Sequence, residues 1–459
     1  MRVALVLGHA TFIALLALAW EHARVRTAFG DTAYQVFKWV NDHGIAVEAH
    51  RYSAILPQLA VKLLKLFHVG LPALLYTASL AHVLVAYGIF LLCLYAFKAP
   101  RTAMAMALAA VLCTRLTFYG PVLEANYLLS YPFLAWALLE GNDGRPLGLL
   151  RILLLWALAM PTLLVHPLGW GVLVFGLFFL MAVGQVQAKD AWVASAAFVM
   201  TFLFLRLLFP PTVYEQGQYV QLQGALGAPM GPWASWDFLV GHTFMYTFNY
   251  LPALVVCLAV FTGYAFAVRW KAVLVGGGGM IVFLAVMLVA YRHGDDAVMM
   301  DRAFLPAGTL LALPASYLFR DLRGRKAWWA LAALTLVLFV KLRDVSFASR
   351  GFSRQMAGLE QLMDAMREHG LDRVQMTRRD LQEHGVVPGW ALPFSSLMIS
   401  SWNGPDRSVA IRLLPDENAG DTLPTSSAAT PTLDLGQRTM DGRYFHIGGG
   451  PWATWPASQ

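Results

Sequence analysis

Residues that could carry out group-transfer chemistry gather in short polar stretches between long apolar runs. The longest of these stretches is residues 21–58, where Asp31 directly follows Gly30. A carboxylate held there could act as a general base and accept a proton from an incoming hydroxyl. The alternative is that Asp31 is the N-cap of a helix over Thr32–Asn41, because aspartate is among the preferred N-cap residues. The two roles are compatible, and Asp31 is our first candidate catalytic residue.

Glu124 is the second candidate catalytic residue, and it lies in the short loop Gly120–Asn126. Acidic residues close to a bilayer are costly and are often functional. The alternative is a solvated loop carboxylate. His166 lies in another short turn between apolar runs. It is a candidate substrate-binding residue, although a lone histidine at such a position is more often structural.

Arginines form a second group of candidates, with the binding of a phosphate as their predicted role. Arg51 and its neighbour Tyr52 lie in loop 21–58. Arg115 and Arg206 lie inside apolar runs. The planar guanidinium group of arginine can bind a phosphate through two parallel hydrogen bonds. The alternative for the two arginines in apolar runs is that each side chain extends to place its charge at the membrane interface.

The densest polar cluster between the late apolar runs is Tyr291–Pro306. Arg292 and His293 lie at its start and are candidate substrate-binding residues. Arg302 lies near its end, where the next apolar run begins. Two interpretations of Arg302 stay open, namely a phosphate ligand and one half of a local ion pair with Asp301.

Metal and cofactor sites are weakly indicated. The adjacent Asp295-Asp296 could bind a divalent metal, but a solvated loop is the alternative for two neighbouring carboxylates. The three cysteines each lie inside an apolar run without metal-ligand spacing, at Cys93, Cys113 and Cys257. A divalent metal is therefore the one cofactor left open, and no metal ligand is assigned.

The polar stretches belong to an unusually apolar chain. Of its 459 residues, 58% are hydrophobic and 13% are charged, whereas a soluble globular protein carries about 25% charged residues. The apolar runs are about 20 residues long, the length at which a helix crosses a bilayer. The formal net charge of +7 comes largely from Lys and Arg at the ends of these runs. That placement is typical of a membrane protein and argues against nucleic-acid binding.

Hydropathy predicts an all-α polytopic membrane protein with about eleven transmembrane helices. The first run is longer than the apolar region of a signal peptide, so we interpret it as an uncleaved span. Residues 52–69 favour an interfacial helix because they contain Lys62 and Lys65, although a crossing stays open. The run Gly276–Gly279 inside a predicted span favours close helix packing or a flexible break. The predicted spans are Val3–Trp20, Leu71–Phe97, Thr102–Tyr119, Tyr127–Leu139, Leu149–Val165, Gly169–Val186, Ala191–Phe209, Tyr250–Val268, Val273–Tyr291, Ala303–Phe319 and Ala327–Val340.

The distribution of Lys and Arg predicts the orientation of the chain. With a cytoplasmic N-terminus, the cytoplasmic turns are short and basic, as the turn 320–326 illustrates. The long polar loops then share the opposite face. We therefore predict a transmembrane domain over 1–340 with its candidate catalytic loop at 21–58, and an extracytoplasmic C-terminal domain over 341–459. The expected location is a bacterial-type cytoplasmic (inner) membrane.

The C-terminal residues have the composition of a small α/β domain. Apolar residues at helical spacing predict a helix over Ser353–Glu368. Arg373–Met376 and Ser395–Ser400 are predicted as short strands. Asp416–Asp434 is rich in Ser, Thr, Pro and Asp and is predicted as a linker. No hydrolase or nucleotide-binding motif is recognisable in this region.

Four short motifs carry a family resemblance: Gly-Asp-Thr-Ala-Tyr at 30–34, His-Arg-Tyr at 50–52, Leu56-Pro57, and Arg-Ala-Phe-Leu-Pro at 302–306. Together with the topology of residues 1–340, they resemble the GT-C superfamily of membrane glycosyltransferases, which use polyprenyl-phosphate-linked sugars. In that family an acidic residue of the first outside loop is the expected catalytic base. Later acidic and basic loop residues hold the acceptor, a metal or the donor phosphate. Asp31 has no second acid beside it, so the resemblance leaves metal dependence open.

The resemblance implies transfer of a sugar from a polyprenyl-phosphate donor to an acceptor at the outer face of the cytoplasmic membrane. Asp31 would deprotonate the acceptor, and Arg302, with the other arginines, would stabilise the phosphate leaving group. The implied partners are the lipid-linked donor, a lipid, glycan or protein acceptor, and membrane lipids, but no nucleic acid. One alternative is a transporter or flippase for a lipid-linked or anionic substrate, in which internal repeats are common. Another is a non-catalytic membrane scaffold that presents the C-terminal domain.

Overall fold

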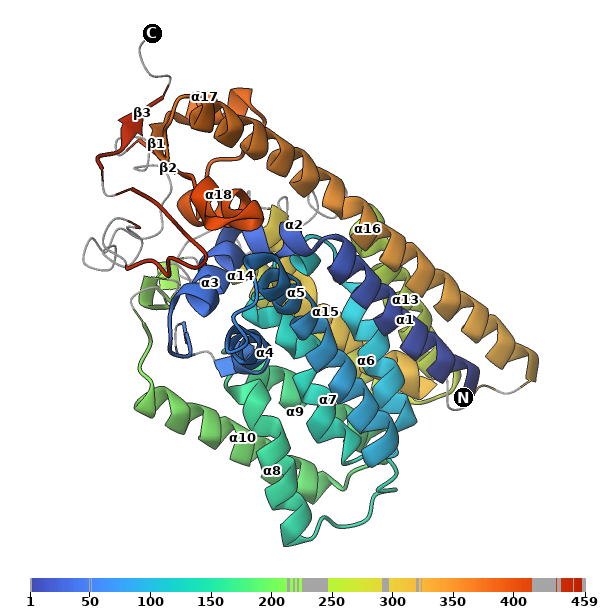
Figure 1. The fold of residues 1–459 in the computed structure, drawn as a ribbon. Helices are drawn as coiled ribbons and strands as arrows, with labels where there is room; N and C mark the ends of the chain where they lie inside the picture. The colour runs from blue at the N-terminus through green and yellow to red at the C-terminus, as the bar shows by residue number, and fades with distance from the viewer. Residues whose placement is uncertain are drawn as a thin grey trace.

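The computed structural model shows a bundle of helices with a small domain at one end (Figure 1). The structure describes residues 2–48, 50, 52–212, 215–217, 219–220, 223–224, 247–290, 297–318, 322, 324–414, 435, 439–448 and 450–455. The first helices are α1 (Arg2–Glu21), α2 (Ala23–Ala28), α3 (Gly30–Asn41), η1 (Tyr52–Ala54), α4 (Ile55–Lys65), α5 (Leu71–Leu91) with the π-helical turn η2 (Leu92–Ala96), and α6 (Pro100–Leu112). The next are η3 (Leu116–Tyr119), η4 (Glu124–Leu129), α7 (Tyr131–Ala137), α8 (Leu149–Leu163), α9 (Gly169–Ala182) and α10 (Ala188–Leu208).

The second half of the chain completes the bundle and then forms the small domain. Its helices in the bundle are α13 (Thr247–Phe266), α14 (Trp270–Ala290), α15 (Ala297–Leu318) and the long α16 (Gly324–Glu368). The remaining elements are β1 (Arg373–Met376), α17 (Arg378–Glu383), α18 (Leu392–Ser400), η6 (Ser401–Asn403), η7 (Pro405–Arg407), β2 (Ala410–Leu413) and β3 (Ala453–Thr454). Helix α15 packs against α6, α13, α14 and α9, so it lies at the centre of the bundle.

Three helices among the described residues are long and apolar enough to span a membrane, at Leu71–Ala96, Ala188–Leu208 and Trp270–Met287. Further apolar helices are shorter, at Leu5–Glu21, Pro100–Leu112, Leu149–Leu163, Gly169–Ala182 and Leu251–Phe266. The chain is therefore a multi-pass membrane protein, whereas the count of eleven spans is not confirmed.

Two of the predicted spans are interrupted or shortened in the structure. The run Thr102–Tyr119 is helical only to Leu112, after which the chain turns into η3. Arg115, between the two elements, has φ −150° and ψ −88°, far from helical values. The run Tyr127–Leu139 contains the end of the 3-10 helix η4 and the seven-residue α-helix α7, but no long helix. The hydropathy of a run indicates that its residues are buried, but it does not show whether the run is one continuous helix. Most residues of these turns are buried inside the protein, so the turns do not interrupt the apolar run.

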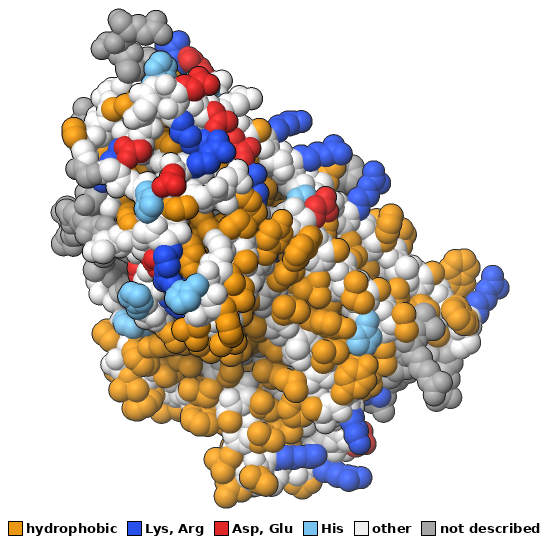
Figure 2. Space-filling view, in the orientation of Figure 1, with side chains coloured by type: hydrophobic (Ala, Val, Ile, Leu, Met, Phe, Trp, Pro, Cys, Tyr) orange, Lys and Arg blue, Asp and Glu red, His pale blue; other side chains and the backbone are white. Residues whose placement is uncertain are grey.

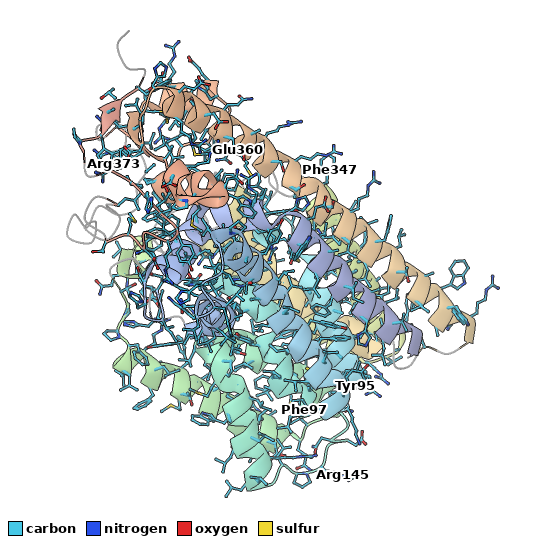
Figure 3. The ribbon with its side chains drawn as sticks, in the orientation of Figure 1. Tyr95, Phe97, Arg145, Phe347, Glu360 and Arg373 are labelled. Atoms are coloured by element: carbon cyan, nitrogen blue, oxygen red, sulfur yellow. The ribbon has the colours of Figure 1, made fainter. Side chains whose placement is uncertain are left out.

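The surface has an apolar band between two charged ends. In Figure 2, hydrophobic side chains cover the middle and lower part of the visible face, and charged side chains gather over the C-terminal domain at the top. Figure 3 places Glu360 and Arg373 at that end and Arg145 at the opposite end. The N-terminus lies away from the C-terminal domain (Figure 1). This separation is expected for a helical membrane protein, and which end faces the cytoplasm stays a prediction.

Helix α16 joins the bundle to the C-terminal domain without a break. It is 45 residues long, and its last part confirms the helix predicted over Ser353–Glu368. The predicted domain boundary at residue 340 falls within this helix. The predicted strand Arg373–Met376 is also confirmed, as the central strand of a parallel sheet of order β2-β1-β3. Its residue Val374 is in register with Ile411 on one side and Ala453 on the other.

The strand predicted at Ser395–Ser400 is wrong, because these residues form the second half of helix α18. All of them are buried, so the helix shows no polar face that would reveal its period. The hydroxyls of Ser395 and Ser396 donate to the carbonyls of Ala391 and Leu392, one helical turn back, at 3.1 and 2.9 Å. A short buried run cannot be assigned to a helix or a strand from periodicity alone.

The polar loop 21–58 is folded into α2, α3, η1 and the start of α4. Helix α3 starts at Gly30, after the N-cap residue Phe29, and Asp31 is therefore its second residue. The prediction that Asp31 is the N-cap is wrong. Gly30 has φ +54°, a left-handed conformation that favours glycine, and this turn starts the helix two residues before the predicted position. The Asp31 carboxylate thus lies in the first turn, where the helix dipole favours negative charge.

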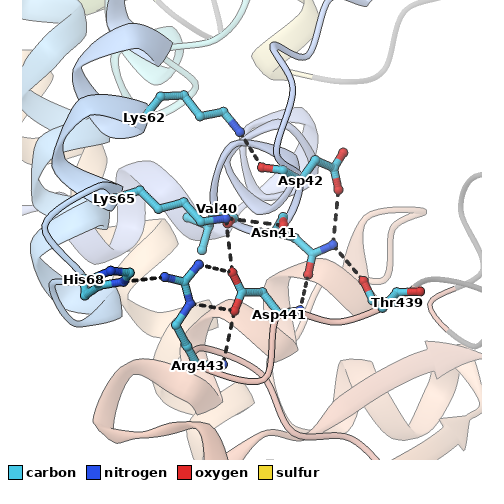
Figure 4. A network of polar contacts seen from close by, with 9 residues as sticks. All are labelled: Val40, Asn41, Asp42, Lys62, Lys65, His68, Thr439, Asp441 and Arg443. Carbon is cyan, nitrogen blue, oxygen red and sulfur yellow. Dashed lines mark hydrogen bonds and ion pairs between the residues drawn. The ribbon is translucent and has the colours of Figure 1, made fainter.

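Asp441 of the C-terminal segment forms polar contacts with the last residues of α3 and α4 (Figure 4). Its carboxylate lies 3.2 Å from the Lys65 ammonium and accepts a hydrogen bond of 2.7 Å from Arg443. Its backbone N–H donates to the Asn41 side chain at 2.8 Å, and Asn41 donates to the Thr439 carbonyl at 3.1 Å. The hydrogen bonds from Arg443, assisted by Lys65, hold the pKa of Asp441 well below its usual range. We call these five residues the Asp441 network.

Candidate functional site

Glu124 and Arg302 form an ion pair between two helical elements that are distant in sequence. Glu124 is the first residue of η4, and Arg302 lies in the second turn of α15, which packs against η4. Arg302 Nη2 donates to Glu124 Oε2 at 3.0 Å. The two side chains are 9% and 13% exposed, so the pair is largely but not completely shielded. A carboxylate and a guanidinium group, both predicted as site residues, are thus in direct contact.

Asp301, the neighbour of Arg302, anchors the start of α15. It is 1% exposed, and one of its oxygens accepts three hydrogen bonds. The donors are the backbone N–H of Arg115 at 3.1 Å, and the backbone N–H and hydroxyl of Thr117, both at 3.0 Å. This anchor fixes the position of the adjacent arginine relative to η3 and η4.

Arg115 is joined to helix α16 through Asp344. Arg115 Nε lies 3.1 Å from Asp344 Oδ1, and Lys341 donates to Asp344 Oδ2 at 2.8 Å. The Lys341 side chain is fully buried, and the Asp344 side chain is 12% exposed. Arg115 is therefore paired with an acid inside the protein, in addition to any contact with the membrane interface.

These contacts bring together residues from three parts of the chain, at 115–124, 301–302 and 341–344. We call this cluster the charged network. Its members are Arg115, Glu124, Asp301, Arg302, Lys341 and Asp344. The network contains three acidic and three basic residues. Its formal charge is therefore balanced without a ligand.

Asp31 is positioned by a different set of contacts. Its helix α3 packs against α2, α4 and α18. Helix α2 in turn contacts η3, which lies next to the charged network. The Asp31 side chain is partly exposed. Convergence of Asp31 with the Glu124–Arg302 pair stays a prediction.

Two other predicted residues, His166 and Arg206, line a second site. They share a cavity of about 30 Å³ with His50 and Glu215. Arg206 lies in the last turn of helix α10, and its Nη1 lies 3.3 Å from both carboxylate oxygens of Glu215. His166 Nδ1 accepts a hydrogen bond of 3.2 Å from the backbone N–H of Leu168, which caps the turn before α9. That bond supports the structural interpretation of the histidine.

Tyr52 lies beside this second site. Its backbone N–H donates to the Leu164 carbonyl at 3.4 Å, and its ring contacts Phe209 at a centroid distance of 5.9 Å. The candidates Arg51, Arg292 and His293 lie outside the described residues. Their proposed role in substrate binding stays a prediction.

No metal centre is assigned in the described part of the chain, where no group of three or more His, Cys, Asp or Glu side chains could hold an ion. The pair Asp295-Asp296 lies outside the described residues. Metal dependence is therefore untested.

Sequence reasoning did not select Lys341 and Asp344 as site residues. The sequence does contain a signal for this pair, because a lysine and an aspartate three residues apart on a helix can form an ion pair. They also follow directly on the last predicted span. The hydrogen bonds from Thr117 to Asp301 have no comparable signal in the sequence, since the residues are 184 positions apart.

Comparison with known proteins identifies no family for this chain. No family model matches it, and no curated protein matches it. Among solved structures, the crystal structure of ArnT from Cupriavidus metallidurans bound to undecaprenyl phosphate is similar. The two chains share 12% sequence identity, with a TM-score of 0.46, over 87% of this chain and 88% of that chain. At this level the similarity assigns neither a ligand nor an activity to the present protein.

Proposed function

We propose that the protein is a membrane glycosyltransferase that transfers a sugar from a polyprenyl-phosphate donor to an acceptor at the outer face of the cytoplasmic membrane. The observation that carries the proposal is the contact between the largely buried side chains of Glu124 and Arg302. A carboxylate can take the proton of an acceptor hydroxyl, and a guanidinium group can hold the phosphate leaving group. Both groups are needed on opposite sides of the bond that is exchanged.

The proposed reaction exchanges one bond at the anomeric carbon of the sugar. The acceptor oxygen forms a bond to this carbon while the bond to the phosphate oxygen breaks, and the polyprenyl phosphate leaves with the electron pair. Glu124 or Asp31 takes the proton of the acceptor hydroxyl. Arg302 and Arg115 balance the negative charge that grows on the phosphate.

The ion pair gives this reaction an order. While no donor is bound, Arg302 holds Glu124 and weakens it as a base, because a nearby positive charge favours the ionised, unprotonated carboxylate. A donor phosphate that binds Arg302 replaces Glu124 as its partner. The carboxylate then becomes available to an acceptor hydroxyl only after the donor has arrived.

The proposal is tested by sugar transfer in proteoliposomes with the full-length protein. A panel of radiolabelled polyprenyl-phosphate pentoses and hexoses serves as donors, and extracted bacterial envelope lipids and glycans serve as acceptors. Glu124→Gln and Asp31→Asn are compared with the wild-type protein. Loss of a general base lowers the rate by about 10²–10⁴-fold, so at least one of the two variants falls by that factor.

Two controls separate catalysis from folding. Thermal unfolding in detergent shows whether each variant keeps the stability of the wild-type protein. Glu383→Gln, in an exposed ion pair of the C-terminal domain, serves as a matched substitution away from the site. Full transfer activity in both Glu124→Gln and Asp31→Asn would contradict the proposal.

A further inference from the structure

Arg26 is a buried arginine that the proposed reaction does not use. It lies in α2 and is 1% exposed. Its Nε donates to the Ser79 hydroxyl at 2.9 Å, one terminal nitrogen donates to the Ser79 carbonyl at 3.2 Å, and the other donates to the Phe118 carbonyl. The guanidinium carbon also lies 3.9 Å from the centre of the Phe118 ring.

These contacts leave the charge of Arg26 without a counter-ion. Its partners are a neutral hydroxyl, two carbonyls and an aromatic ring, and no acidic side chain of the described residues forms an ion pair with it. They also use three of the five N–H groups that an arginine carries. A buried charge is costly unless an opposite charge compensates it.

A cavity of about 90 Å³ lies against the guanidinium group of Arg26. Its polar lining residues include His82 and Thr114, and both carry a buried atom without a hydrogen-bond partner, namely His82 Nε2 and Thr114 Oγ1. His82 Nδ1 is 2.8 Å from the Tyr127 hydroxyl. When that hydroxyl donates, the neutral ring carries its proton on Nε2, and this proton faces no protein acceptor.

The rest of the cavity lining is mixed: apolar residues of the membrane helices lie beside the polar residues Thr117, Asn126, Tyr127 and Ser130. The apolar lining residues include Phe12 and Leu15 of α1, and Val83 and Ala86 of α5. The cavity therefore offers hydrogen-bond donors, and none of its described lining residues carries a negative charge. A bound water needs about 10–15 Å³ of such space, so the cavity is large enough for a small ion together with water.

We infer that this cavity is a binding site for a compact inorganic monoanion of the chloride class, held by Arg26, His82 and Thr114. A monoanion matches the single positive charge of the site. The ligand accepts hydrogen bonds from the free N–H groups of the arginine, from the imidazole and from the hydroxyl. It locks α2 onto α5 and η3, next to the charged network, and so supports loop 21–58.

The test uses the full-length protein in detergent, with sodium gluconate as the background salt and sodium chloride as the probe. Chloride raises the unfolding temperature of the wild-type protein in a saturating manner, as a ligand of the folded state does. Arg26→Gln raises the chloride concentration at half-saturation by about thirtyfold or more, which corresponds to the loss of one partner of a buried charge pair. Arg24→Gln is the matched control, because Arg24 is paired with Glu360 and is not part of the cavity wall.

A measurement on the wild-type protein covers the case in which Arg26→Gln fails to fold. Crystals grown in sodium bromide give an anomalous scattering peak inside the cavity, beside the guanidinium group of Arg26. The inference is overturned by the absence of this peak. It is also overturned if chloride has no effect on the wild-type protein, or if Arg26→Gln and the wild-type protein respond equally.

Discussion

At the scale of single residues, the two sides of the Glu124–Arg302 contact have separable roles. A structural role needs only opposite charges at the two positions, whereas the proposed reaction needs the carboxylate on η4 and the guanidinium group on α15. The structure joins these residues across 178 positions of sequence. Their pairing therefore could not be predicted from the chain, although each residue was selected from its own surroundings as a site candidate.

A charge-swapped double variant distinguishes the two roles. Glu124→Arg alone and Arg302→Glu alone each place like charges together, and each lowers stability by about 3–5 kcal/mol, as breaking a buried pair does. The double variant restores opposite charges and regains most of this stability. We expect it to stay inactive in sugar transfer, because the base and the phosphate ligand have exchanged places. Recovery of both stability and transfer would assign the pair a structural role only.

Asp441 predicts a pH dependence of stability. Its folded-state pKa is depressed, chiefly by the hydrogen bonds from Arg443. The unfolded value for an aspartate is about 3.9. The stabilisation by this carboxylate is therefore fully present above about pH 5 and is lost as the pH falls through 4 towards the folded-state pKa. Asp441→Asn is expected to lower stability at pH 7 by about 1–3 kcal/mol.

The measurement is thermal unfolding of the wild-type protein and Asp441→Asn between pH 3 and pH 7. The difference between the two proteins shrinks as the pH falls below 4. Asp364→Asn is the control, because the Asp364 side chain is 61% exposed. A difference that is constant over the whole range would contradict the role given to the Asp441 carboxylate.

At the scale of elements, the four consecutive glycines of α14 differ in the space around them: two lie against aromatic rings and two face open space. A Cβ atom on Gly279 would lie 2.4 Å from the Phe175 ring of α9, and one on Gly276 would lie 2.6 Å from the Phe261 ring of α13. At Gly277 and Gly278 a Cβ atom would meet nothing within 4 Å. The helix continues through all four, so they allow close packing and do not break the helix.

Gly279→Ala and Gly277→Ala are therefore expected to differ in sign. Gly279→Ala forces the Phe175 ring to move and lowers stability by about 1–3 kcal/mol. Gly277→Ala improves helix propensity in open space and is neutral or stabilising by up to about 1 kcal/mol. Thermal unfolding of the two variants in the same detergent checks this. Equal effects at both positions would contradict the packing described for α14.

Elements were predictable from the sequence where one local signal dominated. The apolar runs gave the helices of the bundle, and the spacing of Met and Leu gave the end of α16. The β-strand at Arg373–Met376 was found, but its neighbours β2 and β3 were not. The two residues of β3 are too few to show an alternating pattern. Helix α3 was found with its correct end at Asn41. Its start was missed, because a left-handed Gly30 is invisible in the hydrophobic pattern.

At the scale of the whole molecule, the membrane class follows from composition, and the position of the C-terminal domain follows from its contacts. Helix α18 packs against α2 and α3, and the Asp441 network binds the ends of α3 and α4. The domain thus covers the polar loop 21–58. The sequence could place the loop and the domain on one face but not in contact, because such contacts join residues about 400 positions apart.

The central claim is that Arg302 exchanges its partner Glu124 for the phosphate of a polyprenyl-linked donor. Binding of undecaprenyl phosphate by the full-length protein, measured by native mass spectrometry, tests it most directly. We predict binding by the wild-type protein and a loss of about tenfold or more in Arg302→Met, because a hydrogen bond to a charged group contributes about 1.5–3 kcal/mol. Glu124→Gln is predicted to bind at least as tightly as the wild-type protein, since the competing carboxylate is gone. An absence of binding by the wild-type protein, or unchanged binding by Arg302→Met, would contradict the claim.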